Sequence, residues 1–202
     1  AMEGGSAILH AEAARNVLLS REFARGDPER AFEEAAVVVG DRFRFHRHAG
    51  VAIETRAYLA DWEPGPGTLT LWSSTQVPGL IRDALAELLE LPAHRVRVVA
   101  PDVGGGFGVK GALYPEELLV AGLSRELGRP VKWTGDRRED LLATTQAWDE
   151  LIDAELALAP DGAILALRAR VIADVGAYSI YPWTASIEPI QTISFLPGPY
   201  RI

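Results

Sequence analysis

The chain is organised around residues 98–111, Val98-Val99-Ala100-Pro101-Asp102-Val103-Gly104-Gly105-Gly106-Phe107-Gly108-Val109-Lys110-Gly111, in which a short apolar run leads into five glycines around one phenylalanine. A glycine cluster between an expected strand and an expected helix indicates positive φ angles or a close approach of the backbone to another group. Two interpretations fit this stretch alone: it contacts a large ligand, or it is a tight connection whose glycines relieve local strain. The rest of the chain has to distinguish them.

The composition is that of a globular protein, with 48% hydrophobic and 24% charged residues in a chain of 202. The net charge of −8 argues against nucleic acid as a partner, because phosphate backbones are bound by basic surfaces. No run approaches the roughly 18 apolar residues of a membrane helix, so we expect no membrane association. The first residues lack the basic and apolar regions of a secretory signal, and we expect a cytoplasmic location.

Cysteine is absent, which excludes disulfides, a thiol nucleophile and cysteine-ligated zinc or iron–sulfur clusters within these 202 residues. Any electron relay therefore lies outside them. Of the four histidines only His46 and His48 lie close together, and no third ligand accompanies the pair. We therefore predict no metal held by protein side chains.

Hydrophobic periodicity predicts both helices and strands. We expect helices at residues 28–36, 78–89 and 114–127. We expect strands at residues 17–19, 37–47, 53–62, 68–74, 95–100, 131–133, 149–158 and 163–173. The strands 37–47, 53–62 and 68–74 follow one another through turns and indicate one antiparallel sheet, and Pro160-Asp161-Gly162 predicts a hairpin. The predicted fold class is α+β, with mixed, largely antiparallel sheets and packed helices.

From Tyr178 onward the periodicity dissolves into an aromatic, proline-rich segment that stops at Tyr200-Arg201-Ile202 without a capped element. An unfinished apolar edge is a poor natural terminus. We therefore expect residues 1–202 to be a fragment of a larger subunit.

A dinucleotide-binding loop is one candidate for the glycines, since Gly106-x-Gly108-x-x-Gly111 fits that fingerprint and Asp136 lies where a ribose-binding acid belongs. Against it, Pro101-Asp102-Val103 separates the strand from the glycines, and the neighbouring strands do not indicate a doubly wound sheet. Val109 and Gly111 flank Lys110 where a phosphate-binding Walker loop needs a glycine and a serine or threonine, so that motif is excluded. An NAD-dependent dehydrogenase domain stays open as the alternative, and so does a non-catalytic interaction module.

Three segments occur in order: Thr75-Gln76, then Leu91-Pro92-x-x-Arg95-Val96-x-Val98, then Gly104-Gly105-Gly106-Phe107-Gly108-x-Lys110. Their order and spacing resemble the first molybdenum-cofactor-binding domain of the xanthine dehydrogenase, aldehyde oxidase and carbon monoxide dehydrogenase large-subunit family. Glu54-Thr55-Arg56-Ala57 and Gly128-Arg129-Pro130-Val131-Lys132 resemble it too, so the resemblance covers nearly the whole chain. It implies a molybdenum–molybdopterin cofactor, a small-molecule substrate, and iron–sulfur clusters and FAD on partner chains or domains.

The resemblance implies five cofactor-binding residues, which are Gln76, Gly105, Gly106, Phe107 and Gly108. Gln76 matches the glutamine that hydrogen-bonds an oxo ligand of the metal, and Phe107 and Gly108 match the loop that lies against the metal's ligands. Neutral backbone donors there suit an anionic group. We expect this loop to be held mainly by the cofactor and the missing domains, because glycines offer little to pack and Phe107 is the one side chain among them.

Two departures from the family narrow the function. Gly111 stands where purine-oxidising members carry a substrate-binding glutamate, so the resemblance points to hydroxylation of an aldehyde or N-heterocycle, or to oxidation of carbon monoxide. The family's general-base glutamate lies beyond any counterpart of Ile202, so no catalytic residue is expected among residues 1–202.

The isolated 202-residue chain should therefore bind neither molybdenum nor pterin, because it holds one wall of the site. Elemental analysis of the purified chain checks this expectation. Stoichiometric molybdenum would contradict it.

Overall fold

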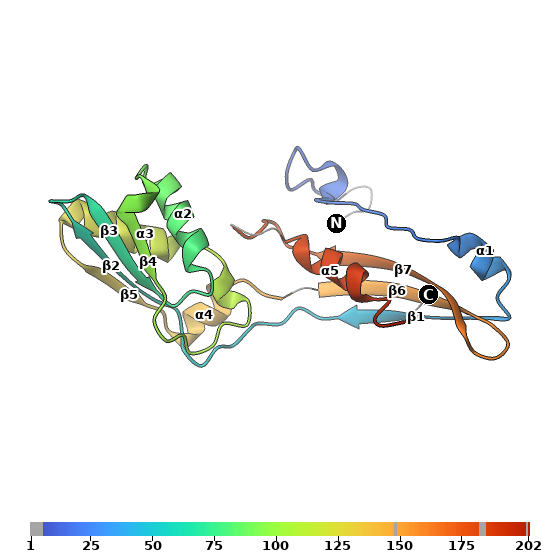
Figure 1. Ribbon diagram of the computed structural model, residues 1–202. Coiled ribbons are helices and arrows are strands. Elements are labelled where there is room, and N and C mark those ends of the chain that lie inside the picture. Colours follow the sequence, from blue (N-terminus) through green and yellow to red (C-terminus); the bar gives the residue numbers. More distant parts are fainter. Residues whose placement is uncertain (1–5, 148, 182–184, 201) are drawn as a thin grey trace. The chain divides into compact units, whose positions relative to one another are not determined.

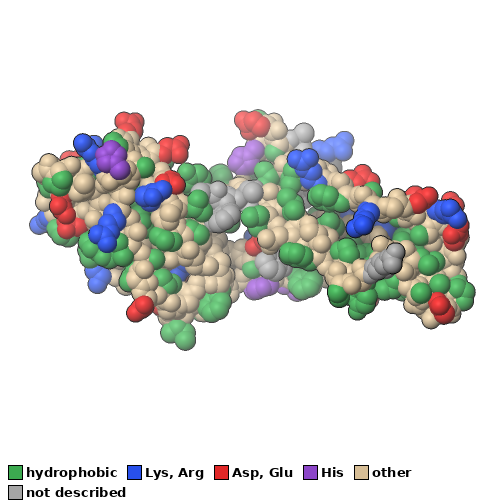
Figure 2. Space-filling view, in the orientation of Figure 1, with side chains coloured by type: hydrophobic (Ala, Val, Ile, Leu, Met, Phe, Trp, Pro, Cys, Tyr) green, Lys and Arg blue, Asp and Glu red, His purple; other side chains and the backbone are tan. Residues whose placement is uncertain are grey.

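The computed structural model describes residues 6–147, 149–181, 185–200 and 202, which form two compact units (Figure 1). One unit comprises the described residues of 48–147 and 180–183, and the other comprises those of 1–47, 148–179 and 184–202. Within the described ranges, no helix is long and apolar enough to cross a membrane. Figure 2 shows basic and acidic side chains interspersed on the visible face of each unit.

The unit around residues 48–147 is built on a four-stranded sheet in the order β4-β3-β2-β5. Its strands are β2 (Ala57–Glu63), β3 (Thr68–Ser73), β4 (Val96–Val99) and β5 (Val131–Thr134). β2 pairs antiparallel with β3 and with β5, whereas β3 pairs parallel with β4. A parallel pair needs a crossover connection, and helix α2 (Pro78–Leu88) supplies it.

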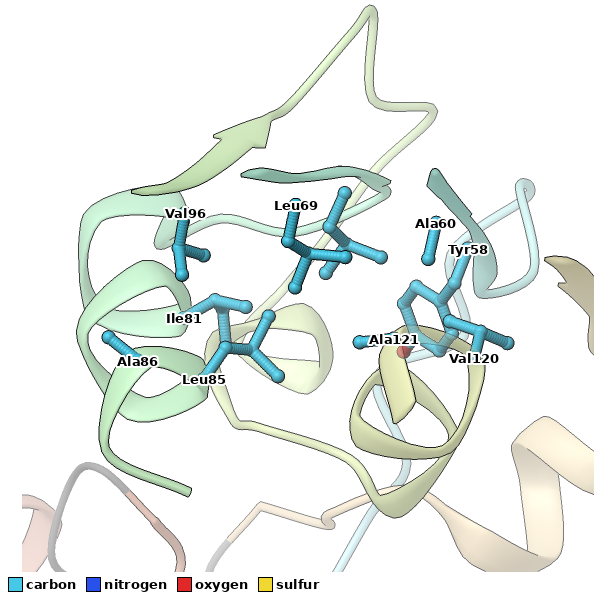
Figure 3. Packing of buried hydrophobic residues seen from close by; sticks show 10 residues of the cluster. Tyr58, Ala60, Leu69, Ile81, Leu85, Ala86, Val96, Val120 and Ala121 are labelled. Atoms are coloured by element: carbon cyan, nitrogen blue, oxygen red, sulfur yellow. The ribbon is translucent and has the colours of Figure 1, made fainter. Parts of the chain in front are cut away.

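Helices α2 and α3 (Pro115–Leu127) bury their apolar sides on this sheet (Figure 3). Leu69 and Leu71 alternate with exposed or half-buried neighbours along β3, as a strand with one buried face requires. Ile81 and Leu85 of α2 lie one helical turn apart and meet them in the core. α3 ends at Gly128, whose φ of 61° places it in the left-handed region typical of a helix C-terminus.

The sheet topology collects three segments at one edge. β3 and β4 are parallel, with Trp72 beside Val99, so the residues that follow both strands leave the sheet on the same side. β2 is antiparallel to β3, with Tyr58 opposite Ser73, so the residues that precede β2 arrive there too. Residues 52–56, residues 74–76 and the glycine loop therefore lie close together.

The other unit contains a three-stranded antiparallel sheet in the order β1-β6-β7. Its strands are β1 (Val37–Phe45), β6 (Asp149–Leu158) and β7 (Ile164–Asp174), and its helices are α1 (Pro28–Glu33) and α5 (Ile187–Phe195). The side chain of Asp27 caps α1 by accepting a hydrogen bond from Arg30 N at 3.2 Å. Short elements complete the two units: η1 (Ala14–Asn16), η2 (Ala93–Arg95), η3 (Val109–Gly111) and α4 (Arg137–Ala143).

The α+β class, the three expected helices and the hairpin of β6 and β7 are confirmed. Of the single antiparallel sheet expected for residues 37–47, 53–62 and 68–74, the pairing of β2 with β3 is confirmed, but the inclusion of β1 is wrong, because β1 pairs with β6. The parallel pairing of β3 with β4 was not expected. Periodicity predicts that a segment is extended but does not determine its partner. The strand expected at 17–19 does not form among the described residues, and α4 and α5 were not expected. Residues 182–184 and 201 of the segment after Tyr178 lie outside the described residues.

A buried carboxyl at the start of α3 makes the stability of the fold depend on pH. Glu117 accepts hydrogen bonds from Tyr114 N at 3.0 Å and Ser73 Oγ at 2.7 Å. Burial raises the pKa of Glu117 to about 7, and these hydrogen bonds and the charge of Arg56 offset only part of that rise.

Because folding raises this pKa above its ordinary 4.5, the fold favours the protonated form. Its contribution to the free energy of unfolding should be complete below that ordinary value and lost as the pH rises through about 7. Urea unfolding at several pH values should show a decline from about pH 5 to about pH 8 that is weaker in Glu117→Gln. Equal declines in the two proteins would contradict this.

Candidate functional site

Gln76, just beyond the end of β3, is bound to the glycine loop through its side chain. Its Oε1 accepts hydrogen bonds from Gly108 N and Lys110 N, both at 3.1 Å, and its own backbone N donates to Lys110 O at 2.9 Å. Since both loop groups are donors, the amide atom that faces them is the oxygen. The Nε2 group is therefore turned away, and no described residue accepts a hydrogen bond from it.

Gly106 lies directly against the Gln76 amide. A Cβ at Gly106 would lie 2.5 Å from Gln76 Cδ and 2.6 Å from its Oε1, so any larger residue displaces the glutamine side chain. The N–H groups of Gly106 and Phe107 have no hydrogen-bond acceptor among the described residues. The edge of the sheet thus presents three neutral donors that meet no acceptor among the described residues: Gln76 Nε2 and these two backbone amides.

The backbone at the centre of the loop is left-handed at three positions. Gly105 and Gly108 have φ angles of 99° and 85°, which glycine adopts without strain. Phe107 has a φ of 52°, which is uncommon for a residue with a side chain and costs free energy. Its side chain is 76% exposed, so no local packing compensates for that cost. Strained, exposed aromatic residues of this kind occur at sites of function.

The loop is also held at both ends by Glu54. Its Oε2 accepts hydrogen bonds from Gly104 N and from Lys110 Nζ, each at 2.7 Å. Burial tends to raise the pKa of Glu54, but the hydrogen bonds from Lys110 and Gly104 and the lysine charge outweigh it and lower the pKa. The expectation that little except the cofactor anchors the loop is therefore wrong, because polar side chains from outside it replace the missing apolar packing.

Two arginines hold the segment that carries Glu54. Arg56 is completely buried, and its guanidinium pairs with Asp140 and Glu116 at 3.1 Å each. Arg137, in the first turn of α4, donates to the backbone carbonyls of the two residues before Glu54. Sequence reasoning assigned no role to Glu54 or Lys110. No local signal indicated their pairing, which joins residues 56 positions apart in the sequence.

The dinucleotide alternative is not supported by this geometry. Asp136 is the N-cap of α4: its Oδ1 accepts from Glu139 N at 2.8 Å, and its own N donates to Glu139 Oε2 at 2.8 Å. Residues 112–114 separate Gly111, in η3, from the start of α3, so the glycines do not place a phosphate at a helix N-terminus. Among the described residues, no group of three or more His, Cys, Asp or Glu side chains could hold a metal ion.

Residues 9–202 match the family model described as molybdopterin cofactor-binding domain. The match spans nearly the whole sequence, and the chain belongs to this family. The resemblance that the sequence motifs indicated is thereby confirmed, and a similar solved structure supports the α+β fold class.

Among curated relatives, the chain is 37% identical to the nicotine 6-hydroxylase large subunit of Paenarthrobacter nicotinovorans, over 98% of this chain and 24% of the relative. It is 42% identical to the carbon monoxide dehydrogenase large chain of Afipia carboxidovorans, over 81% of this chain and 21% of the relative. Its structure resembles that of quinoline 2-oxidoreductase from Pseudomonas putida 86, with a TM-score of 0.74 and 44% sequence identity. The similarity covers 80% of this chain and 20% of the quinoline 2-oxidoreductase chain. The chain thus spans between a fifth and a quarter of these proteins.

Gly106→Ala tests the contact between the loop and Gln76. The added methyl should push the glutamine amide away and free the amides of Gly108 and Lys110, with a loss of about 1–2 kcal/mol in unfolding free energy. Urea unfolding and amide hydrogen exchange measure both effects. Gly111→Ala is the matched control, because a Cβ at Gly111 meets nothing within 4 Å. Equal effects of the two substitutions would contradict the proposed contact.

Proposed function

We propose that this chain is part of the molybdopterin-binding large subunit of an oxidoreductase, a molybdenum hydroxylase that hydroxylates an aldehyde or N-heterocycle, or that oxidises carbon monoxide. One observation carries the proposal: Gln76 and the 104–108 loop meet at one edge of a sheet and leave three donors without an acceptor in the described part of the chain. The membership in the molybdopterin cofactor-binding domain family supports it.

The residues at this edge fit such a cofactor. Gln76 Nε2 and the N–H groups of Gly106 and Phe107 are neutral donors, which suit the anionic oxygen or sulfur atoms that the cofactor presents. When bound, the molybdenum cofactor would supply the oxidation–reduction chemistry. Gln76, Gly105, Gly106, Phe107 and Gly108 would hold it: the free amides would hydrogen-bond its polar atoms, and the exposed Phe107 ring would be available to exclude water.

The substrate is proposed to be a small molecule other than a purine. Gly111 has no side chain with which to hydrogen-bond a purine at the position where the family's purine-oxidising members carry glutamate. Relatives named for nicotine, quinoline and carbon monoxide support substrates of the N-heterocyclic or carbon monoxide type.

Iron–sulfur and FAD subunits or domains are the proposed redox partners. The absence of cysteine within these 202 residues places any cluster elsewhere, and relatives named as a large subunit and as subunit gamma of a complex support partner subunits. The cytoplasmic location and the lack of a nucleic-acid partner stay predictions.

Molybdenum analysis of the complete protein tests the proposed function. A molar ratio near one supports it, whereas a protein without molybdenum would favour the non-catalytic interaction module. Fluorescence titration with NADH tests the dinucleotide alternative, for which we expect no binding.

Gln76→Glu should separate the two hydrogen-bonding roles of this side chain in the complete protein. A carboxylate still accepts from Gly108 N and Lys110 N, so the loop and the thermal stability should be retained, but it cannot donate as Nε2 does. We expect turnover to fall at least about tenfold, which corresponds to about 1.4 kcal/mol of lost stabilisation. Gln76→Ala, which loses both roles, should also weaken the loop. Unchanged turnover in Gln76→Glu would show that Nε2 has no part in the site.

A further inference from the structure

A single carboxylate oxygen bridges the two ends of the glycine loop. Glu54 Oε2 accepts from Gly104 N and Lys110 Nζ, each at 2.7 Å, and Glu54 N donates to Gly104 O at 3.2 Å. A Cβ at Gly104 would lie 2.5 Å from Glu54 Cβ, so the two backbones are as close as a glycine allows. The loop is therefore closed from outside by a residue about fifty positions earlier in the sequence.

Lys110 connects this closure to Gln76. Its side chain is 1% exposed, and Glu54 is the one carboxylate with which it pairs among the described residues. Its backbone N donates to Gln76 Oε1, and its backbone O accepts from Gln76 N and from Thr75 Oγ1 at 3.2 Å. A displacement of Lys110 would thus move the glutamine amide as well as the end of the loop.

We infer that Glu54 and Lys110 are positioning residues, whose ion pair holds the loop so that Gln76 Nε2 and the amides of Gly106 and Phe107 point to the cofactor. The orientation toward a cofactor rests on the proposed function, whereas the closure of the loop does not. Five glycines between residues 104 and 111 have much backbone entropy to lose on ordering, and apolar packing cannot offset it at an exposed Phe107. An ion pair with one buried partner supplies the constraint, because Lys110 without Glu54 would be a buried, unpaired charge.

The alternative is an ion pair that merely stabilises the unit. Both roles predict a less stable protein in Glu54→Gln and Lys110→Met, so stability alone does not distinguish them. The double variant does, because it leaves no buried charge unpaired and should regain most of the stability that Glu54→Gln loses by leaving Lys110 buried without its carboxylate. It still lacks the charged bridge from position 54 to the far end of the loop.

The matched control is Glu116→Gln, which weakens another ion pair of the same unit. Glu116 pairs with the buried guanidinium of Arg56 at 3.1 Å and makes no described contact with the loop. Arg56 keeps its ion pair with Asp140 at 3.1 Å in this variant, so stability should fall without loosening residues 104–110.

Amide hydrogen exchange of the complete protein in its cofactor-free form, read at positions 108 and 110, tests the inference. These two amides donate to Gln76 Oε1 and so report its position. We expect exchange at both to accelerate at least about tenfold in Glu54→Gln and in the double variant, and to stay within about twofold of the wild type in Glu116→Gln. The double variant keeps the test available if a single variant does not fold.

Unchanged exchange at positions 108 and 110 in the folded double variant would overturn the inference. Equal acceleration in Glu116→Gln would overturn it too, because the effect would then reflect general stability. Neither result depends on molybdenum, so failure of the proposed function is recognised separately, by the metal analysis. In the complete protein, the double variant should also retain less molybdenum than Glu116→Gln at equal thermal stability.

Discussion

The parallel pairing of β3 with β4 determines most of the architecture of the unit around residues 48–147. It requires the crossover helix α2, whose apolar side forms the core with Leu69 and Leu71. It also sends the residues after both strands out of the same edge of the sheet. The antiparallel β2 begins at that edge, so three segments distant in sequence meet there. The candidate site is the product of this arrangement.

The glycine loop at this edge is held by polar groups and not by a hydrophobic core. Glycines have no side chains to pack, and the ring of Phe107 is exposed, so residues 104–108 contribute no buried apolar side chain. Gln76 Oε1 and Glu54 Oε2 each accept two hydrogen bonds from the loop instead. These acceptors bind only some of the N–H groups of the loop, so the amides of Gly106 and Phe107 stay available for a ligand. A loop packed by apolar side chains would not expose them.

The buried cations of this acidic chain have structural roles close to the site. Arg56 and Lys110 are both fully enclosed, and each meets a carboxylate at hydrogen-bonding distance. Arg56 also lies 4.0 Å from the centre of the Tyr114 ring, which adds a cation–π contact at the start of α3. Taking such charges out of water is costly, so these ion pairs add little net stability. Their location beside the loop fits a role in fixing the positions of the segments that they join.

Local residue patterns were enough to predict the α+β class, the helices α2 and α3, and the hairpin of β6 and β7, whereas Gln76 and the glycine loop were assigned to one site through the resemblance to the family. Those patterns reflect the hydrophobic period, turn residues and motif spacing, all of which lie within short windows of sequence. The partner of β1, the parallel pairing of β3 and β4, and the bridge from Glu54 to Lys110 were decided only by the tertiary structure. Each joins residues whose contact depends on how the whole sheet assembles, and the period of a strand carries no information about that distant partner.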